Sequence, residues 1–249
     1  MNNSAIKLQG VAYYVDCYKF WDLERCSSAF KSPEYSEIIT QIMTKNRASR
    51  AGGMFNGKQL FAVIDFDDYE KSYEKYYATL PKNVRRDTKN SLKKFYFKEY
   101  NFNDFVYDFS EINHSQTKRK NNVNKWYLKD PTFFLGSNHG KHEWEDKRHF
   151  SKWYGLFKHY KNYKQGSVVT HEKLFAYVKV AVEGEMASIN LIWAHADHLK
   201  EGAMFHLVTS VVSEMMSINT VRCLVYYGTG QKQWKERLQF KFQPIELIL

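Results

Sequence analysis

The sequence predicts an α+β protein in which a central mixed sheet carries helices on both faces, preceded by an N-terminal α/β extension. Apolar runs rich in β-branched and aromatic residues, typical of strands, alternate along the chain with apolar residues at helical spacing. Some successive strands are joined by turns short enough for a hairpin, and others are separated by a helix. Hairpins make antiparallel neighbours and intervening helices allow parallel ones, so we expect a mixed sheet covered by helices.

The extension, residues 1–93, begins with three predicted elements. Gly10–Phe20 alternates loosely and is interpreted as a strand. Pro33 can open a helix that continues to Met43, because proline is tolerated in a first turn. Met54–Ile64 is predicted to be a hairpin, because it contains an Asn-Gly pair, and both central residues of that tight turn need a positive φ.

Two helices separated by Pro81 are predicted to end the extension. Asp67 and Asp68 can cap the first helix, which extends to about Leu80. The second helix carries cations on one broad side, opposed only by Asp87: Arg85, Arg86, Lys89, Lys93 and Lys94. Such a side is either a solvated face, as most charge runs are, or a face directed at phosphates or a membrane, and both interpretations stay open.

The main unit, residues 94–249, is predicted to start with a strand at Phe95–Tyr100 and a helix that ends near Ile112. Asn101 or Asn103 can cap this helix. Further along, aromatic residues at helical spacing predict an amphipathic helix over Lys147–Tyr163.

Two stretches of the main unit lack periodicity and are predicted loops, Ser115–Lys125 and Pro131–Asp146. Histidines in and just after the second stretch raise the possibility of a metal: His139, His142 and His149, with Glu143 among them. Their spacing is not that of a helix-borne ligand pair, and no cysteine lies close. We therefore interpret the stretch as an exposed loop and predict no metal.

The remainder of the chain is predicted to contain most of the sheet. Lys173–Val182 and Met186–Ala194 flank a short turn and form a second hairpin. After a polar loop, an apolar stripe predicts a helix from Met204 to Met216 that faces the core. The last predicted elements are a strand at Val221–Tyr226, a short helix from Gln231 to Phe240 and a closing strand from Gln243 to Leu249.

Composition limits the class of protein. The 249 residues are 43% hydrophobic and 26% charged, which is typical of a globular chain. No apolar run is long enough to span a bilayer, and the first residues lack the apolar segment of a signal peptide. The three cysteines, Cys17, Cys26 and Cys223, fit no metal-ligand spacing, so we expect reduced thiols and a cytoplasmic location.

The charge predicts an anionic partner. Lys and Arg number 37 against 27 Asp and Glu, a formal net charge of +10, and aromatic residues make up 17% of the chain. RNA, a phosphorylated or CoA-type cofactor, a nucleotide sugar and the surface of an acidic membrane all suit this balance. Aromatic rings beside cations suit single-stranded RNA, but the sequence contains no RNA-binding signature.

The polar loop His195–Gly202 contains the candidate site residues that local chemistry indicates. A helix start presents free backbone N–H groups and the positive end of its dipole, so Lys200 and Gly202 could hold a phosphate there. His195 and His198 are candidate bases because imidazole exchanges protons near neutral pH. An ordinary strand-to-helix turn, with polar residues capping the helix, is the alternative for all four residues.

The order of elements from Phe95 onward resembles that of the GNAT acyltransferase fold. It is most similar to a divergent branch with the Fem-type aminoacyl transferases and the GNAT-like enzymes of surface-polysaccharide clusters. Three stretches carry the likeness: a basic helix before a strand at Leu80–Lys94, a helix end followed by Arg at Glu111–Arg119, and a Trp-Lys helix before a closing strand at Gly228–Phe240.

The resemblance implies an acyl- or aminoacyltransferase that modifies an amino sugar or a cell-surface glycan precursor. Its donor would be acyl-CoA, held at Lys200, Gly202 and Ala203, or aminoacyl-tRNA. The stretch keeps only one Gly and the Ala of the usual GNAT phosphate loop. By the same likeness Tyr226 or Tyr227 would protonate the leaving thiolate. Arg85 and Arg119 are candidates for a phosphate or carboxylate on the acceptor. Trp234 and Lys235 are candidates for the acceptor pocket, with the core as the alternative for Trp234. The alternative is a non-enzymatic basic module that binds RNA or an anionic membrane surface.

Overall fold

The computed structural model describes residues 4–8, 11–15, 54–55, 58–115, 128–134, 149–165, 168–183, 185–227 and 232–248. Four of the predicted features lie outside these residues: the helix from Pro33 to Met43, the turn Asn56-Gly57, Arg119 and the histidine-rich segment 135–148.

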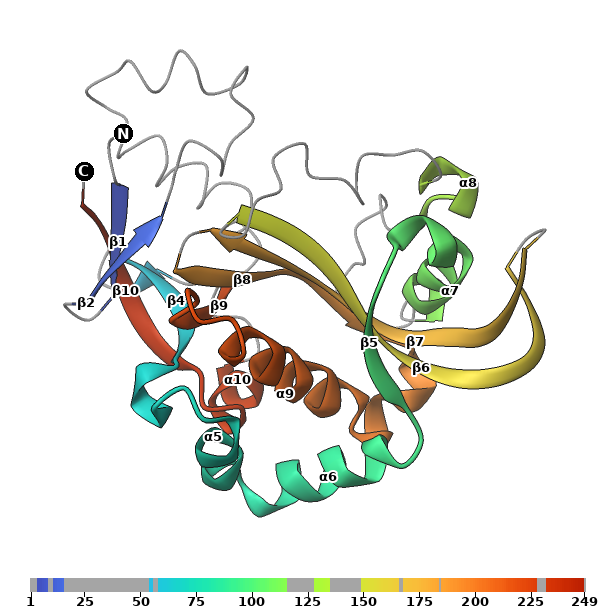
Figure 1. Ribbon diagram of the computed structural model, residues 1–249, viewed down its shortest axis with the longest axis horizontal. Helices are drawn as coiled ribbons and strands as arrows, with labels where there is room; N and C mark the ends of the chain where they lie inside the picture. The colour runs from blue at the N-terminus through green and yellow to red at the C-terminus, as the bar shows by residue number, and fades with distance from the viewer. Residues whose placement is uncertain are drawn as a thin grey trace, which may run out of the picture.

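The described strands form one sheet (Figure 1). They are β1 (Ser4–Leu8), β2 (Val11–Val15), β3 (Met54–Phe55), β4 (Lys58–Asp65), β5 (Tyr96–Tyr100), β6 (His149–Gln165), β7 (Val168–Glu183), β8 (Met186–Ala194), β9 (Cys223–Tyr227) and β10 (Lys241–Ile248). The order across the sheet is β2-β1-β10-β4-β9-β8-β7-β6-β5, with β3 beside β4. Among the described pairs only β8 and β9 run parallel, so the predicted mixed sheet is confirmed.

The described helical segments lie between these strands. They are the 3-10 helices η2 (Asp67–Tyr69), η3 (Phe102–Phe105) and η6 (Ala196–Glu201), and the α-helices α5 (Tyr73–Thr79), α6 (Lys82–Leu92), α7 (Val106–Ser115), α8 (Pro131–Phe134), α9 (Ala203–Met216) and α10 (Lys232–Arg237). None of them is both long enough and apolar enough to cross a bilayer.

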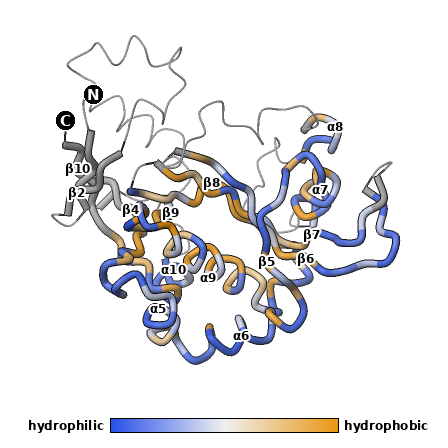
Figure 2. Tube along the Cα trace, viewed as in Figure 1, coloured by the Kyte–Doolittle hydropathy of each residue, from blue (hydrophilic) through white to orange (hydrophobic). Residues whose placement is uncertain are grey.

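Helices cover both faces of the sheet, as predicted. On one face α9 packs on β6, β7 and β8, and α5 and α6 pack on α9. On the other face α7 packs on β7 and β8 (Figure 1). Side chains of β7 divide between the two cores: Val178 joins the core under α9, and Tyr177 joins the core under α7. Figure 2 shows the same arrangement, with hydrophobic strands and α9 at the centre and a hydrophilic α6 outside.

The predicted helix over Lys147–Tyr163 is wrong, because this segment is the long strand β6. Both faces of its first half are buried, with Trp153 and Phe157 in the core under α7 and Tyr154 and Leu156 in the core under α9. A strand buried on both faces loses the polar half of its alternation. Its apolar residues then fall by chance at helical spacing, which the sequence pattern could not distinguish from a real helix.

The remaining differences from the predictions are local. Ser72, rather than the Asp pair, caps α5, because its hydroxyl accepts a hydrogen bond from the N–H of Lys75 at 3.3 Å. The polar loop after β8 forms η6, and the predicted loop at Pro131 begins with α8. The predicted domain boundary between residues 93 and 94 stays a prediction. Strand β4, which belongs to the predicted N-terminal extension, lies between β9 and β10 in the main sheet.

Candidate functional site

Gly202 lies at the junction of η6 and α9, where the chain reverses. Its φ is +80°, a conformation that a side chain disfavours. A Cβ atom built at this position would lie 2.5 Å from the carbonyl oxygen of Asp87 in α6. Glycine is therefore required here by the backbone angle and by the close approach of α6.

The burial of this junction conflicts with the predicted phosphate cradle. Gly202 and Ala203 are both buried, and the backbone of Asp87 fills the side of Gly202 that was expected to be open. A CoA pyrophosphate does not fit against these two residues as α6 lies here, so we derive no step from one bound there. Lys200 is exposed next to the junction, and its role in donor binding stays a prediction.

His198 belongs to a hydrogen-bonded series that ends on Lys94, just after α6. Its Nδ1 lies 2.8 Å from Oε2 of Glu201, and Oε1 of Glu201 accepts a hydrogen bond from Nζ of Lys94 at 2.6 Å. The bond from Lys94 holds the pKa of Glu201 below its usual value. With Nδ1 donating to Glu201, the neutral imidazole has its lone pair on Nε2, the arrangement of a base oriented by a carboxylate.

Two aromatic rings fix the plane of the His198 ring. Phe95 and Phe175 contact it edge to face, with centroid distances of 5.3 Å and 4.9 Å. The side chain of His198 is 18% exposed, so it is held between the two rings and part of it still meets solvent.

His195 lies beside His198 but has a different environment. The ring centroids are 5.8 Å apart. Nδ1 of His195 accepts a hydrogen bond from the N–H of Asp197 at 3.4 Å, and its Nε2 lies 3.8 Å from Glu111 on α7. Burial lowers the pKa of His195, against the opposing effect of the two carboxylates. Because Nδ1 caps η6 and Nε2 faces Glu111, His195 is less suited than His198 to take a proton from an acceptor.

A second group of predicted residues meets at β9 and α10. Nζ of Lys235 lies 4.0 Å from the ring centroid of Tyr226 and 3.5 Å from the backbone oxygen of the same residue. Trp234 contacts Tyr226 edge to face at 6.2 Å and stacks on Phe205 of α9 at 6.1 Å. Three predicted residues, Tyr226, Trp234 and Lys235, are thus brought together beside the first turns of α9.

Lys235 is a buried cation, with 3% of its surface exposed. Burial lowers its pKa to about 8, because an ammonium group loses hydration when it leaves water. The face of the Tyr226 ring offsets part of this loss by a cation–π contact. A lysine held this close to neutrality can give up or take a proton at physiological pH, which an exposed lysine does not do.

The parallel strands β8 and β9 lie next to this group. β8 and β9 pair from Met186 and Cys223 to Ile189 and Tyr226. β8 continues to Ala194, and no further pair with β9 is found in the part of the chain that the structure describes. The carboxyl ends of parallel strands are a common position for ligand sites in α/β proteins.

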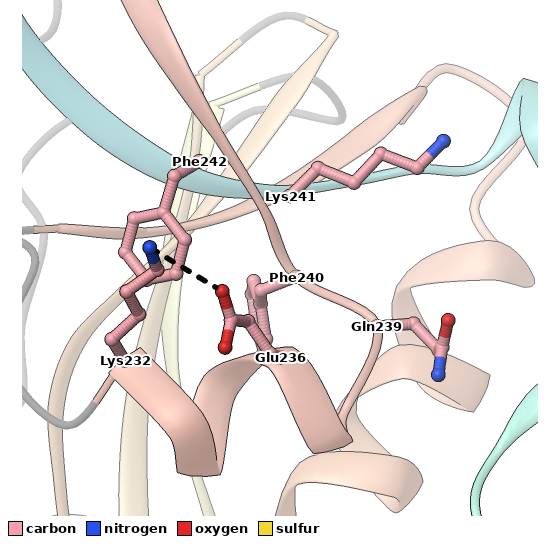
Figure 3. A pocket seen from close by; sticks show the side chains of 6 residues that line it. All are labelled: Lys232, Glu236, Gln239, Phe240, Lys241 and Phe242. Carbon is pink, nitrogen blue, oxygen red and sulfur yellow. Dashed lines mark ion pairs between the residues drawn. The ribbon is translucent and has the colours of Figure 1, made fainter.

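An open hollow lies on the other side of α10, against β10. Its volume is about 420 Å³, and its walls are formed by Lys232, Glu236, Gln239, Phe240, Lys241 and Phe242 (Figure 3). Lys232 and Glu236 form an ion pair of 3.7 Å across one rim. Phe242 also lies 6.0 Å from Nζ of Lys235, so the hollow adjoins the buried lysine.

Of the two arginines predicted to bind the acceptor, the structure describes Arg85 but not Arg119. Arg85 is half-buried on α6, and its Nε has no hydrogen-bond partner among the described residues. Arg119 lies outside the described residues, so its role stays a prediction. The described residues also hold no cluster of three or more His, Cys, Asp or Glu side chains suited to a metal.

Sequence reasoning missed Glu201 and Lys94, the two residues that orient His198. Glu201 follows His198 by three positions, one turn of a helix, and this spacing could have indicated the pair. Lys94 is 107 positions from Glu201, so no local pattern pointed to it.

The sheet order, the parallel pair β8–β9 and the helices on both faces define a divergent GNAT-like fold. The structure of FemX superposes with a TM-score of 0.56 at 8% sequence identity, covering 78% of this chain and 62% of FemX. L-PGS from Bacillus licheniformis has a TM-score of 0.46 at 10% identity, covering 76% of this chain and 59% of that one. A GCN5-related N-acetyltransferase from Kribbella flavida has a TM-score of 0.38 at 7% identity, covering 76% and 56%.

The likeness extends to the fold alone and to part of each neighbour. The chain spans about three fifths of the length of FemX and L-PGS. No protein-family model and no curated protein matches the sequence.

Proposed function

We propose that this chain is a cytoplasmic acyl- or aminoacyltransferase. It would move the acyl group of an activated donor, acyl-CoA or aminoacyl-tRNA, to an amine or hydroxyl of a sugar or cell-surface glycan precursor. The observation that carries the proposal is the series Lys94–Glu201–His198, in which a carboxylate orients an imidazole ring. Tyr226 lies at the carboxyl end of a parallel strand pair, which is a common position for a ligand site and supports the proposal.

In the proposed reaction His198 acts as the general base. Its Nε2 takes the proton from the acceptor N–H or O–H as that atom attacks the acyl carbonyl. The new bond joins the acceptor atom to the acyl carbon, and the bond from that carbon to the donor sulfur or oxygen breaks. Glu201 stabilises the imidazolium that forms, and Lys94 keeps Glu201 ionised and in position.

The leaving group needs a proton, and Lys235 could supply it from its position beside Tyr226 at the carboxyl end of β9. Its pKa of about 8 makes it a competent acid at neutral pH. Tyr226, which its ammonium group contacts, is the other candidate for this step. The donor and acceptor classes rest on the resemblance to Fem-type and polysaccharide-cluster enzymes.

A transfer assay with His198→Gln tests the proposal. Acetyl-CoA and aminoacyl-tRNA are each incubated with the protein and an amino-sugar acceptor, and the acylated sugar is measured by mass spectrometry. We expect product with one donor in the wild type, and a decrease in kcat of roughly 10²–10⁴-fold in the variant with little change in KM. His171→Gln, at an exposed histidine of β7, is the matched control. No product with either donor, or full activity of His198→Gln, would contradict the proposal.

A further inference from the structure

The end of α6 and the outer part of β6 carry exposed or half-buried lysines that have no carboxylate partner among the described residues. No ion pair with a described residue is formed by Lys89, Lys93, Lys158, Lys161 or Lys164. The neighbouring carboxylates already have partners: Asp87 binds Arg86 at 2.9 Å, Glu201 binds Lys94 at 2.6 Å, and Glu172 binds Lys98. The positive charge of this region is therefore not neutralised by the described part of the chain.

Aromatic contacts bring the outer part of β6 close to the residues that follow α6. Nζ of Lys158 lies 4.4 Å from the ring of Phe95, which closely follows α6, and 4.8 Å from the ring of Phe175. Tyr160 stacks on Phe175 at 6.1 Å. Lys158 of β6 therefore lies beside Phe95, three positions after the end of α6, and Figure 2 shows both segments as hydrophilic.

A bulge turns the outer part of β6 toward solvent. The pairing of β6 with β7 shifts register between His159 and Tyr163, and Asn162 has a φ of +56°. Such an irregularity re-aims the side chains of the bulged strand. Residues from His159 to Asn162 are exposed as a result.

Two large apolar side chains are exposed among these lysines. Leu92, at the end of α6, is 55% exposed, and Tyr160 is 42% exposed. Among the residues whose side chains the structure describes, the other exposed large hydrophobic side chains are those of Tyr107 and Phe133. Half of the exposed apolar side chains in the described part of the chain thus lie on the surface that also carries the unpaired lysines.

We infer that this surface, formed by Lys89, Leu92, Lys93, Lys158, Tyr160 and Lys161, docks on an anionic lipid bilayer. The lysines are attracted to acidic headgroups, and a leucine and a tyrosine can enter the boundary between headgroups and acyl chains. An RNA partner would use the lysines and the tyrosine ring, but it would leave an exposed leucine in contact with water or phosphate. The combination of charge with an exposed aliphatic side chain therefore favours the membrane. The inference goes beyond the proposed transferase and does not depend on it.

Vesicle flotation with designed variants tests this inference. The wild type should float with vesicles of phosphatidylglycerol and phosphatidylcholine, and should remain unbound with phosphatidylcholine alone. Each lysine near an anionic surface contributes about fivefold to binding, so Lys89→Gln/Lys158→Gln/Lys161→Gln should weaken it roughly a hundredfold. The matched control is Lys129→Gln/Lys152→Gln/Lys241→Gln, which removes the same charge from other parts of the surface and should bind nearly as the wild type does.

Substitution of the exposed apolar residues distinguishes a membrane partner from a nucleic-acid partner. Leu92→Ser/Tyr160→Ser should weaken vesicle binding about tenfold, and Leu92→Ser alone should account for part of this loss. Thermal melting of each variant checks that it is folded. Absence of wild-type binding to anionic vesicles would overturn the inference. Binding to single-stranded poly(U) RNA that exceeds vesicle binding and is unaffected by Leu92→Ser would also overturn it, in favour of RNA.

Discussion

Replacement of Gly202 by alanine should destabilise the fold, whatever this residue contributes to binding. The residue has a φ of +80°, and its missing Cβ would lie 2.5 Å from the carbonyl oxygen, 2.7 Å from the carbonyl carbon and 2.9 Å from the Cβ of Asp87. Two of these three atoms are backbone, so the conflict cannot be relieved by a change of rotamer. Either α6 or the start of α9 must move.

The two effects can be estimated separately. A non-glycine residue in the left-handed region costs about 1–2 kcal/mol. Overpacking of a well-packed contact costs typically about 1–3 kcal/mol. Together they predict a loss of roughly 2–5 kcal/mol in the free energy of unfolding, which for a chain of this size lowers Tm by roughly 4–20 °C. Gly202→Val should be at least as destabilising, because valine adds branching at the same Cβ.

Urea unfolding and thermal melting of Gly202→Ala measure this loss. Lys200→Ala is the control, because Lys200 is exposed two positions earlier and its removal should change stability by less than about 0.5 kcal/mol. A loss below about 1 kcal/mol in Gly202→Ala, or equal losses in the two variants, would refute the packing argument. In that case the glycine would again be open to its predicted role beside a donor phosphate.

Two further predictions concern buried titratable groups. Burial lowers the pKa of His206 from 6.5 to about 4. Between pH 6.5 and pH 4 the unfolded chain therefore binds a proton that the folded chain does not, and the free energy of unfolding falls by up to about 3 kcal/mol as the pH is lowered. His206→Gln should remove this part of the pH dependence in urea unfolding, and an unchanged slope would contradict it. Lys235→Met should raise stability at pH 7 by about 1–3 kcal/mol, because it removes the cost of burying a charge that stays protonated below pH 8. The same variant should lose transfer activity, and a more stable variant with full activity would limit Lys235 to packing.

The elements that sequence predicted well have one clear periodicity and one buried side. The stripe from Met204 to Met216 follows helical spacing, and α9 buries it as expected. Met54–Ile64 was predicted from a turn signal between apolar runs, and its strands β3 and β4 do pair. In both cases the local pattern contains the information that the fold uses.

The strand β6 shows where such patterns fail. Its first half is buried on both faces, so its apolar residues carry no alternation, and its second half is polar because it is exposed at the bulge. The signal that separates a strand from a helix depends on contrast between the two sides of the element. The first half of β6 has no such contrast in its sequence, because the sheet and the helical layers bury both of its sides.

The residues of the candidate site also divide into those that a local sequence pattern could indicate and those that it could not. His198 was predicted from its chemistry, and Glu201 was within reach of a spacing argument, because both lie in η6. Lys94, which holds Glu201, comes from a distant part of the chain. Gly202 was predicted to let a phosphate approach the backbone, whereas in the structure the backbone of α6 occupies that position. Contacts between elements far apart in sequence leave no local pattern to read.

Helix α6 connects the two proposals through its last turn. It packs on α9 with Ser91, whose hydroxyl lies 3.1 Å from Nδ1 of the buried His206, and it closes the junction at Gly202. Lys94, just beyond its end, orients Glu201 and thereby His198, while Lys93 faces solvent on the proposed membrane-docking surface. Adjacent lysines would thus serve the proposed base and the proposed docking surface. Because α6 is fixed on α9 by buried contacts, a bilayer bound at Lys93 would leave the backbone that positions Lys94 in place, so docking and base orientation are compatible.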